Sequence, residues 1–159
     1  MNEQAMQSIV DAVVSKIKPS KDMTLDAAQR LAAKVRARAE QMGVKAVVAI
    51  SNKAAHPVLV ESMDDAYIAS YDIAVQKAFT VVSLKMSTST LKPLAQPGGS
   101  LYGIQFTNAG KIVVFGGCEP LKNPQGETIG GIGVSGGSEE QDTKLAAYGK
   151  EIFEKGQYL

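Results

Sequence analysis

The residues best suited to hold a metal or a cofactor are few, because the chain contains one histidine and one cysteine. His56 falls among turn-forming residues, where a side chain could project into a pocket. Histidine is a common protein ligand of haem iron, so His56 is the candidate axial ligand and the candidate metal ligand. A solvated turn histidine without a role is the alternative. A zinc site built from several His and Cys side chains is disfavoured by the same count.

A glycine-rich stretch, residues 110–138, contains the second group of candidates. Cys118 and Glu119 follow Gly116 and Gly117 in a predicted loop, and a buried, unreactive thiol is the simpler interpretation of Cys118. Dense glycine indicates either close packing of the backbone or a flat ligand lying against it.

Residues 131–136 match the G-x-G-x-x-G pattern of dinucleotide-binding loops. That pattern binds a nucleotide inside a βαβ unit, whereas here we expect one helix and no further strand after it. Residues 138–141 predict a capping box, and Glu139, Glu140 and Asp142 place negative charge at the helix N-terminus, where a phosphate would have to bind. The pattern therefore does not predict a nucleotide site.

The overall composition excludes several classes of partner. A formal net charge of +1, with dispersed lysines and arginines, gives no basic surface for nucleic acid. No apolar run is long enough to span a bilayer, and no signal-peptide pattern is evident, so we expect no membrane partner. A single cysteine fits a reducing, cytoplasmic setting.

The pattern of apolar residues and turn formers predicts one α+β domain. Helices are expected near residues 24–42, 64–85 and 139–155. Five strands are expected at residues 44–51, 57–63, 101–107, 111–115 and 127–134, and hairpins between them favour a mainly antiparallel sheet. Pro57 is expected at a strand start or on an edge strand. Residues 123–126, Asn-Pro-Gln-Gly, are expected to form a type I turn before the last strand. One face of the second helix carries small residues, which favours close contacts between subunits; these are Ala66, Ser70, Ala74 and Ala78.

The first 18 residues form a separate amphipathic helix in this interpretation, followed by a linker at residues 19–22 and a domain at residues 23–159. Its apolar face consists of Met6, Ile9, Val10, Val13, Val14 and Ile17. So short a helix is marginal in water and needs a surface to dock on, either its own domain or another protein.

Four segments resemble the GlcG-like family. They are MTLDAAQRLAAKVRARAEQMGV from residue 23, MDDAYIASYDIAVQKAFTVVSLKMST from residue 63, PGGSLYGIQFTNAGKIVVFGGCEPL from residue 97 and GETIGGIGVSGGSEEQDTKLAAYG from residue 126. That family includes haem-binding proteins and the C-terminal domain of PduO-type corrinoid adenosyltransferases. Residues 1–18 are in turn similar to the encapsulation peptides of bacterial microcompartment cargo.

The resemblance implies a profilin- or PAS-like domain with a five-stranded sheet, assembled as a homo-oligomer around haem or, alternatively, a corrinoid. The candidate cofactor-binding residues are His56, Tyr102, Gly116, Gly117, Cys118 and Glu119. Two stretches depart from the family pattern: residues 53–57 replace a glycine-rich turn, and residues 116–121 have Cys-Glu where a third glycine and a valine are usual.

The expected function is therefore that of a cofactor-binding oligomer in the cytoplasm, carried into a microcompartment by docking of residues 1–18 on a shell or core protein. A haem-degrading or redox enzyme is the first alternative. An oligomeric scaffold that holds no ligand is the second.

Overall fold

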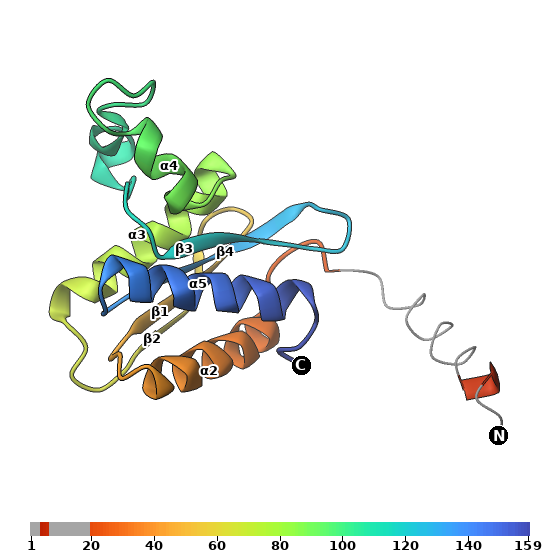
Figure 1. The fold of residues 1–159 in the computed structure, drawn as a ribbon. Coiled ribbons are helices and arrows are strands. Elements are labelled where there is room, and N and C mark those ends of the chain that lie inside the picture. Colours follow the sequence, from red (N-terminus) through yellow and green to blue (C-terminus); the bar gives the residue numbers. More distant parts are fainter. Residues whose placement is uncertain (1–3, 7–19) are drawn as a thin grey trace.

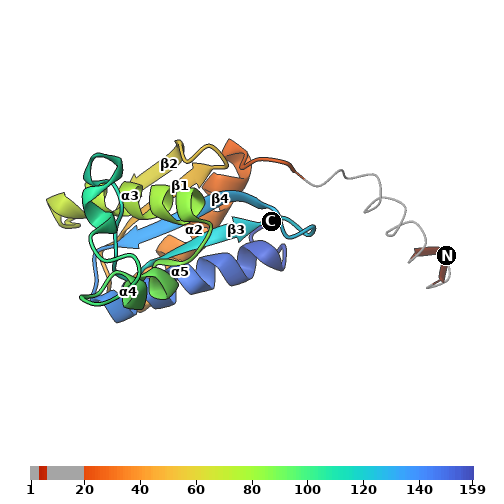
Figure 2. The ribbon, with the colours of Figure 1, turned by 90° about the horizontal axis from the view of Figure 1, so that it is seen from above.

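A computed structural model describes residues 4–6 and 20–159 of the chain. In this part of the chain a single antiparallel sheet has the strand order β2-β1-β4-β3. Helices α2 and α5 cover one face of the sheet and α3 covers the other, while α4 and the segment after it protrude from the body (Figures 1 and 2). The α+β class and the antiparallel sheet are thus as expected.

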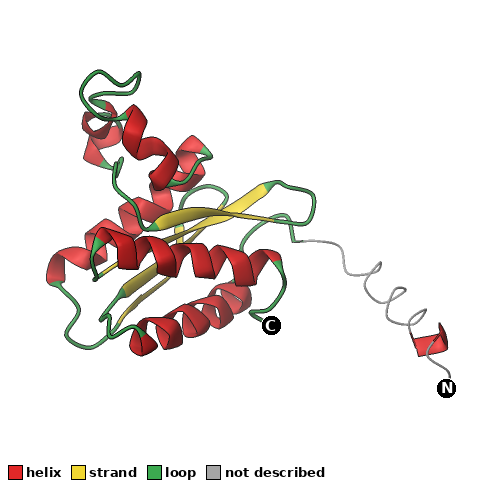
Figure 3. Cartoon of the chain, in the orientation of Figure 1, coloured by secondary structure: helices red, strands yellow, loops and turns green. Residues whose placement is uncertain are grey.

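Along the chain the strands come in two consecutive pairs, with helices before, between and after the pairs (Figure 3). The strands are β1 (Val47–Asn52), β2 (Pro57–Ser62), β3 (Cys118–Lys122) and β4 (Thr128–Ser135). The α-helices are α2 (Leu25–Gln41), α3 (Ile68–Leu84), α4 (Thr88–Leu94) and α5 (Glu139–Glu154), and two short 3-10 helices are η1 (Ile104–Phe106) and η2 (Asn108–Gly110).

The main core lies between the sheet and the pair α2 and α5. Leu31 and Val35 of α2 meet Ile132 of β4 and Leu145 of α5, and all four are fully buried. Both helices begin at side-chain caps, of which the one at α5 is the predicted capping box. Thr24 accepts a hydrogen bond from the Ala27 amide, and Ser138 forms a capping box at α5.

On the opposite face, α3 packs closely on β4 at the glycines of the G-x-G-x-x-G pattern. A Cβ atom added to Gly133 would lie 2.7 Å from the backbone nitrogen of Ala78 and closer still to the carbonyl oxygen of Ala74. A Cβ atom on Gly131 would lie 2.8 Å from the Ala78 carbonyl oxygen. The glycines therefore serve helix–strand packing, the first of the two interpretations offered for this stretch, and α3 occupies the space above them.

The small face of α3 is used in the same contact. Ser70, Ala74 and Ala78 are buried against the sheet of their own chain. The inference that this face brings subunits together is therefore wrong, because the face is already covered.

The expected count of five strands is also wrong, since the described residues contain four. Residues 101–107 and 111–115 do not form a hairpin. Gly103 and Ala109 have left-handed backbone conformations, which interrupt an extended strand; the short helix η1 follows Gly103, and Ala109 lies inside η2. The following segment crosses α3, where the Val113 amide donates to the Thr80 hydroxyl at 3.0 Å instead of to a strand.

Several boundaries follow turn chemistry. Pro57 is the first residue of edge strand β2, as expected for a residue without an amide proton. The Gly126 amide donates to the Asn123 carbonyl at 2.9 Å and closes the predicted turn between β3 and β4. Helix α3 begins at Ile68 and not at Asp64, because Asp65 has a φ of 62°.

The apolar face predicted for the first helix lies mostly outside the described residues. Met6 is described and exposed, whereas Ile9, Val10, Val13, Val14 and Ile17 fall outside. In residues 4–6 and 20–159, no helix has the length and apolar character needed to cross a membrane.

Candidate functional site

The structure places the predicted site residues at two opposite ends of the sheet. Gly116 and Gly117 immediately precede β3, whose first residue, Cys118, pairs with Gly133 near the end of β4. The His56 amide donates to the side chain of Asn52 at the other end of β1. Gly117 is bonded to Val134 of β4 and Asn52 pairs with Gly130, so four residues of β4, roughly 13 Å along the strand, separate the two levels, and β3 and β1 lie on opposite sides of β4. One chain therefore does not bring His56 together with the residues at 116–119.

Cys118 lies at the start of a strand and not in the predicted loop. Its side chain is buried, and its thiol donates to the Thr88 hydroxyl at 3.0 Å. Burial raises the pKa of the Cys118 thiol to about 12. Such a thiol is neither a nucleophile nor an accessible iron ligand in this conformation.

The side chains of Glu119 and Tyr102 lie apart from those of His56 and Cys118 and from each other. The Glu119 carboxylate accepts from Lys150 of α5 at 3.2 Å, so it is engaged on the α5 side of the sheet. Tyr102 lies on the protruding segment and is exposed. Of the six predicted cofactor-binding residues, only Gly116 and Gly117 adjoin the hollow described next.

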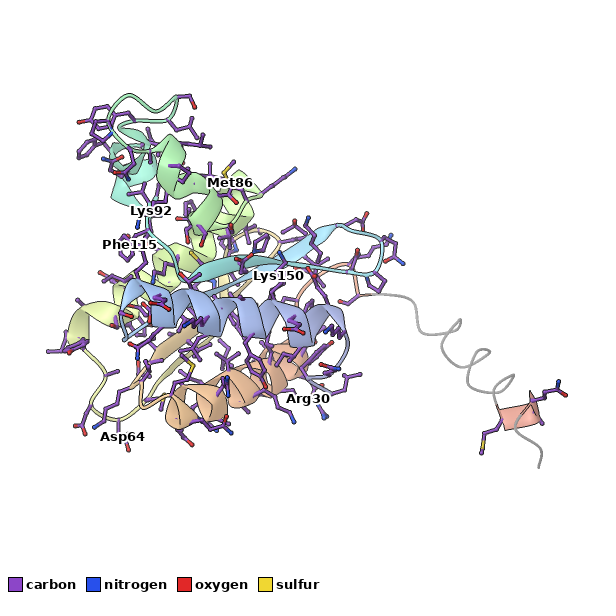
Figure 4. The ribbon with its side chains drawn as sticks, viewed as in Figure 1. Arg30, Asp64, Met86, Lys92, Phe115 and Lys150 are labelled. Carbon is purple, nitrogen blue, oxygen red and sulfur yellow. The ribbon has the colours of Figure 1, made fainter. Side chains whose placement is uncertain are left out.

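An open hollow lies where β4 ends, between the start of α3 and the start of α5. Its volume is about 340 Å³, near the lower limit of roughly 300–1,000 Å³ for small-molecule sites. We call it the Phe115 hollow, and it is lined by Tyr67, Ala69, Ser70, Ile73, Phe115, Ser135, Gly136, Gly137, Glu139 and Asp142. Figure 4 labels Phe115 and Lys92 where the body of the domain meets the protruding segment.

The wall of the Phe115 hollow is largely apolar and open to solvent. Tyr67 is 73% exposed and Phe115 is 39% exposed, and Ile73 of α3 also lines the hollow. Ile68, at the first turn of α3 beside Tyr67, is 97% exposed. Exposed aromatic and aliphatic side chains at a concave surface are typical of a ligand or protein contact.

The two carboxylates of the hollow are each paired with a lysine. Glu139 accepts from Lys92 at 2.6 Å and from the Gly116 amide at 2.9 Å, and the bond from Lys92 is the main cause that lowers the pKa of Glu139. Asp142 pairs with Lys77 at 3.1 Å. Burial raises the pKa of Asp142, although the charge of Lys77 opposes this.

The sequence interpretation missed the role of this second pair. It treated Asp142 only as a charge at a helix N-terminus and assigned no role to Lys77. A signal was present: Lys77 lies between Ala74 and Val81 on the buried face of α3, where a charge requires a partner. Sequence spacing does not identify that partner, which is 65 residues away.

No group of three or more His, Cys, Asp or Glu side chains is arranged to hold a metal ion within the described ranges 4–6 and 20–159. The arrangement at the Phe115 hollow is instead that of an apolar contact surface with neutralised carboxylates. It suits a flat, largely apolar ligand better than a bare cation.

Comparison with protein families gives a match over residues 23–151 to the family described as haem degrading protein HbpS-like. An uncharacterized 15.0 kDa protein of Citrobacter freundii, from the dhaT-dhaS intergenic region, is 40% identical over 131 residues, which are 82% of this chain and 92% of that protein. The corrinoid adenosyltransferase PduO of Salmonella typhimurium is 41% identical over 109 residues. The match covers 69% of this chain but only 32% of the adenosyltransferase.

Solved structures share the fold. Klebsiella pneumoniae protein ORFY superimposes with a TM-score of 0.81 and 38% identity, over 87% of this chain and 94% of that one. A structure titled as the PduOC:heme complex superimposes with a TM-score of 0.78 and 35% identity, over 82% and 94% of the two chains.

Proposed function

This chain belongs to the haem degrading protein HbpS-like family, and from that premise we propose that it is a cofactor-binding module for a flat tetrapyrrole, haem in the first place. The observation that carries the proposal is the Phe115 hollow, an open surface with an aromatic and aliphatic wall. A similar structure titled as a haem complex supports the choice of ligand.

The residues of the hollow fit such a ligand. Tyr67, Ile73 and Phe115 offer apolar surface to one face of a macrocycle. Glu139 and Asp142 are neutralised by Lys92 and Lys77, so they do not oppose the carboxylates of haem as free charges would. Bound haem would supply an iron centre capable of electron transfer or ligand binding. The protein would supply the apolar contact and the exclusion of water from one face.

His56 could reach haem in this hollow only from a neighbouring subunit. Within one chain it lies at the far end of the sheet from the hollow. We therefore propose the imidazole of a neighbouring copy as the axial ligand. The His56→Ala variant should lose or strongly shift the Soret band of bound haem while its far-UV circular dichroism stays unchanged. An identical spectrum would assign the iron to another ligand.

Haem titration followed at the Soret band separates a binding module from a scaffold. We expect saturation at a fixed haem-to-chain ratio, whereas no spectral change would favour the ligand-free scaffold. The family name also raises an enzyme as the second candidate. Loss of the Soret band with release of iron, in the presence of a reductant and oxygen, would favour haem degradation. Competition by cobalamin would test the corrinoid alternative suggested by the similarity to PduO.

We also propose that the protein is a homo-oligomer. Ile68 is 97% exposed at the start of α3, next to the apolar wall of the Phe115 hollow, and exposed apolar surface of this kind is typical of protein contacts. Light scattering at micromolar concentration should give the mass of a dimer or a larger assembly. A monomeric mass would contradict the proposal, and Ile68→Glu tests the start of α3 as part of the interface.

Residues 1–18 are proposed to dock the protein on a microcompartment shell or core protein. Support comes from their predicted apolar face and from the family match, which begins only at Met23. A fluorescent reporter fused to residues 1–18 should be recruited to co-expressed shells, and the changes Val10→Glu and Val13→Glu should abolish recruitment. Deletion of residues 1–18 should leave the melting temperature of the domain almost unchanged. A large loss of stability, with a diffuse reporter, would mean that the segment packs on its own protein.

A further inference from the structure

Lys77 is an unusual residue for the middle of a packed helix face. Of the lysines in the described part of the chain, it is the one whose side chain is fully buried. Its ammonium group donates to the Val134 carbonyl at 2.7 Å and to Asp142 at 3.1 Å. It also lies 5.0 Å from the ring centre of Phe115, within the range of a cation–π contact. One group thus contacts β4, α5 and the segment before β3.

The ammonium lies where the pairing of β3 with β4 ends. The Val134 amide donates to the Gly117 carbonyl at 2.8 Å, and the Val134 carbonyl accepts from the Lys77 ammonium. The next amide, that of Gly116, bonds to Glu139 of α5 instead. A Cβ atom on Gly117 would lie 2.5 Å from the Lys77 nitrogen, so the chain approaches the ammonium too closely for a side chain.

Asp142 extends the same network toward the loop between β4 and α5. Its second carboxylate oxygen accepts from the Gly137 amide at 2.9 Å. The carboxylate thus connects the ammonium of α3 to the backbone of Gly137. The side chains of Phe115 and Asp142, together with Gly137, line the Phe115 hollow.

Stability alone does not account for a charged pair in this position. Replacing a buried ion pair by apolar residues of similar volume is often neutral or stabilising, whereas removing one partner is strongly destabilising. Buried pairs of this kind can instead define one conformation among several close alternatives. Here the groups whose positions depend on the pair belong to the lining of the hollow.

We propose that Lys77 and Asp142 are positioning residues that set the shape of the Phe115 hollow by fixing Phe115 and the Gly136–Gly137 backbone. The expected effect on ligand affinity rests on the proposed function, whereas the positioning of the rim by the pair does not. Lys77 acts from outside the lining of the hollow, and Asp142, which is 4% exposed, acts from its edge.

The test is the double variant Lys77→Met with Asp142→Leu, compared with each single change. We expect the double variant to melt close to the wild type and both single variants to melt far lower. In the ligand-free double variant, the amides of residues 115–117 and 136–137 should exchange hydrogen at least tenfold faster than in the wild type. Haem affinity should fall at least tenfold.

Wild-type exchange rates and wild-type haem affinity in a folded double variant would overturn the inference. If the double variant does not fold, Asp142→Asn replaces the carboxylate with a side chain of the same size, and the same exchange measurement decides. Unchanged exchange at residues 136–137 in that variant would also overturn it. If the wild type binds no haem, the proposed function fails, and exchange in the ligand-free proteins still decides whether the pair positions the rim.

Discussion

The change Gly133→Ala tests whether β4 requires glycine at this position so that α3 can pack closely on it. The added methyl group would lie 2.7 Å from the Ala78 amide nitrogen and 2.9 Å from the Lys77 Cβ atom, with the Ala74 carbonyl oxygen closer still. Two of these three atoms belong to the backbone of α3. A side chain could rotate away, but a helix backbone moves only as a unit, so α3 must shift from the sheet.

The expected cost is set by that shift. Overpacking a close-packed contact costs about 1–3 kcal/mol, and the backbone clash places Gly133→Ala at the upper end, about 3 kcal/mol. For a domain of this size each kcal/mol lowers the melting temperature by roughly 2–4 °C. We therefore expect a melting temperature about 6–12 °C below that of the wild type.

Thermal unfolding followed by far-UV circular dichroism measures this difference. The matched control is Gly126→Ala in the turn between β3 and β4, where an added Cβ atom meets nothing within 4 Å but φ is +80°. The left-handed conformation alone costs about 1–2 kcal/mol. A Gly133→Ala variant that melts no lower than the Gly126→Ala control would refute the packing explanation.

Three further outcomes follow from individual side chains. A thiol reagent at pH 8 should label Cys118 slowly in the folded protein and rapidly in denaturant, because burial raises its pKa to about 12; equal rates would contradict the burial. The pKa of Glu139 is lowered from its ordinary value of 4.5 in the folded protein, so the unfolded chain takes up the proton more readily and the stabilisation is lost as the pH falls below about 4.5. Glu139→Gln should therefore be less stable than the wild type at pH 7 and approach it at pH 3, and a constant difference in melting temperature would argue against the ion pair with Lys92. Ser138→Ala should cost about 1 kcal/mol by removing the cap of α5, as measured by urea denaturation.

Local sequence rules predicted the elements whose geometry depends on neighbours in the chain. The capping box of Ser138 and Gln141 fixed the start of α5, and the turn at Asn123–Gly126 fixed the β3–β4 connection. Pro57 marked the start of an edge strand. Each of these depends on contacts within a few residues, which the sequence displays directly.

The predicted hairpin at residues 101–115 failed because residues 101–107 form short turns on the protruding segment and residues 111–113 bond to α3 and not to a strand. Ile112 and Val113 are buried, which produces the pattern of a strand, but the partner of the Val113 amide is Thr80 of α3. An apolar run of this length shows that a segment is buried without showing what it packs against.

The candidate site was predicted only in part for a similar reason. Gly116 and Gly117 were predicted to bind a cofactor, and in the structure they approach side chains of α3 and α5 closely. His56 and Cys118 were chosen for their chemistry, and the fold separates the first from the hollow and buries the second. Tertiary contacts between residues far apart in the chain decide both outcomes.

The central claim is that a flat tetrapyrrole binds at the Phe115 hollow. The most direct measurement is a haem titration, followed at the Soret band, of the wild type and of the variants Phe115→Ala and Phe106→Ala. Phe106 is an equally large aromatic residue on the protruding segment, outside the hollow. Burial of a fully exposed aromatic side chain is worth about 1.5–3 kcal/mol, and Phe115 is 39% exposed, so Phe115→Ala should raise the Kd for haem about three- to sevenfold and Phe106→Ala should leave it unchanged. A wild-type Kd in the Phe115→Ala variant would contradict the assignment of haem to this hollow.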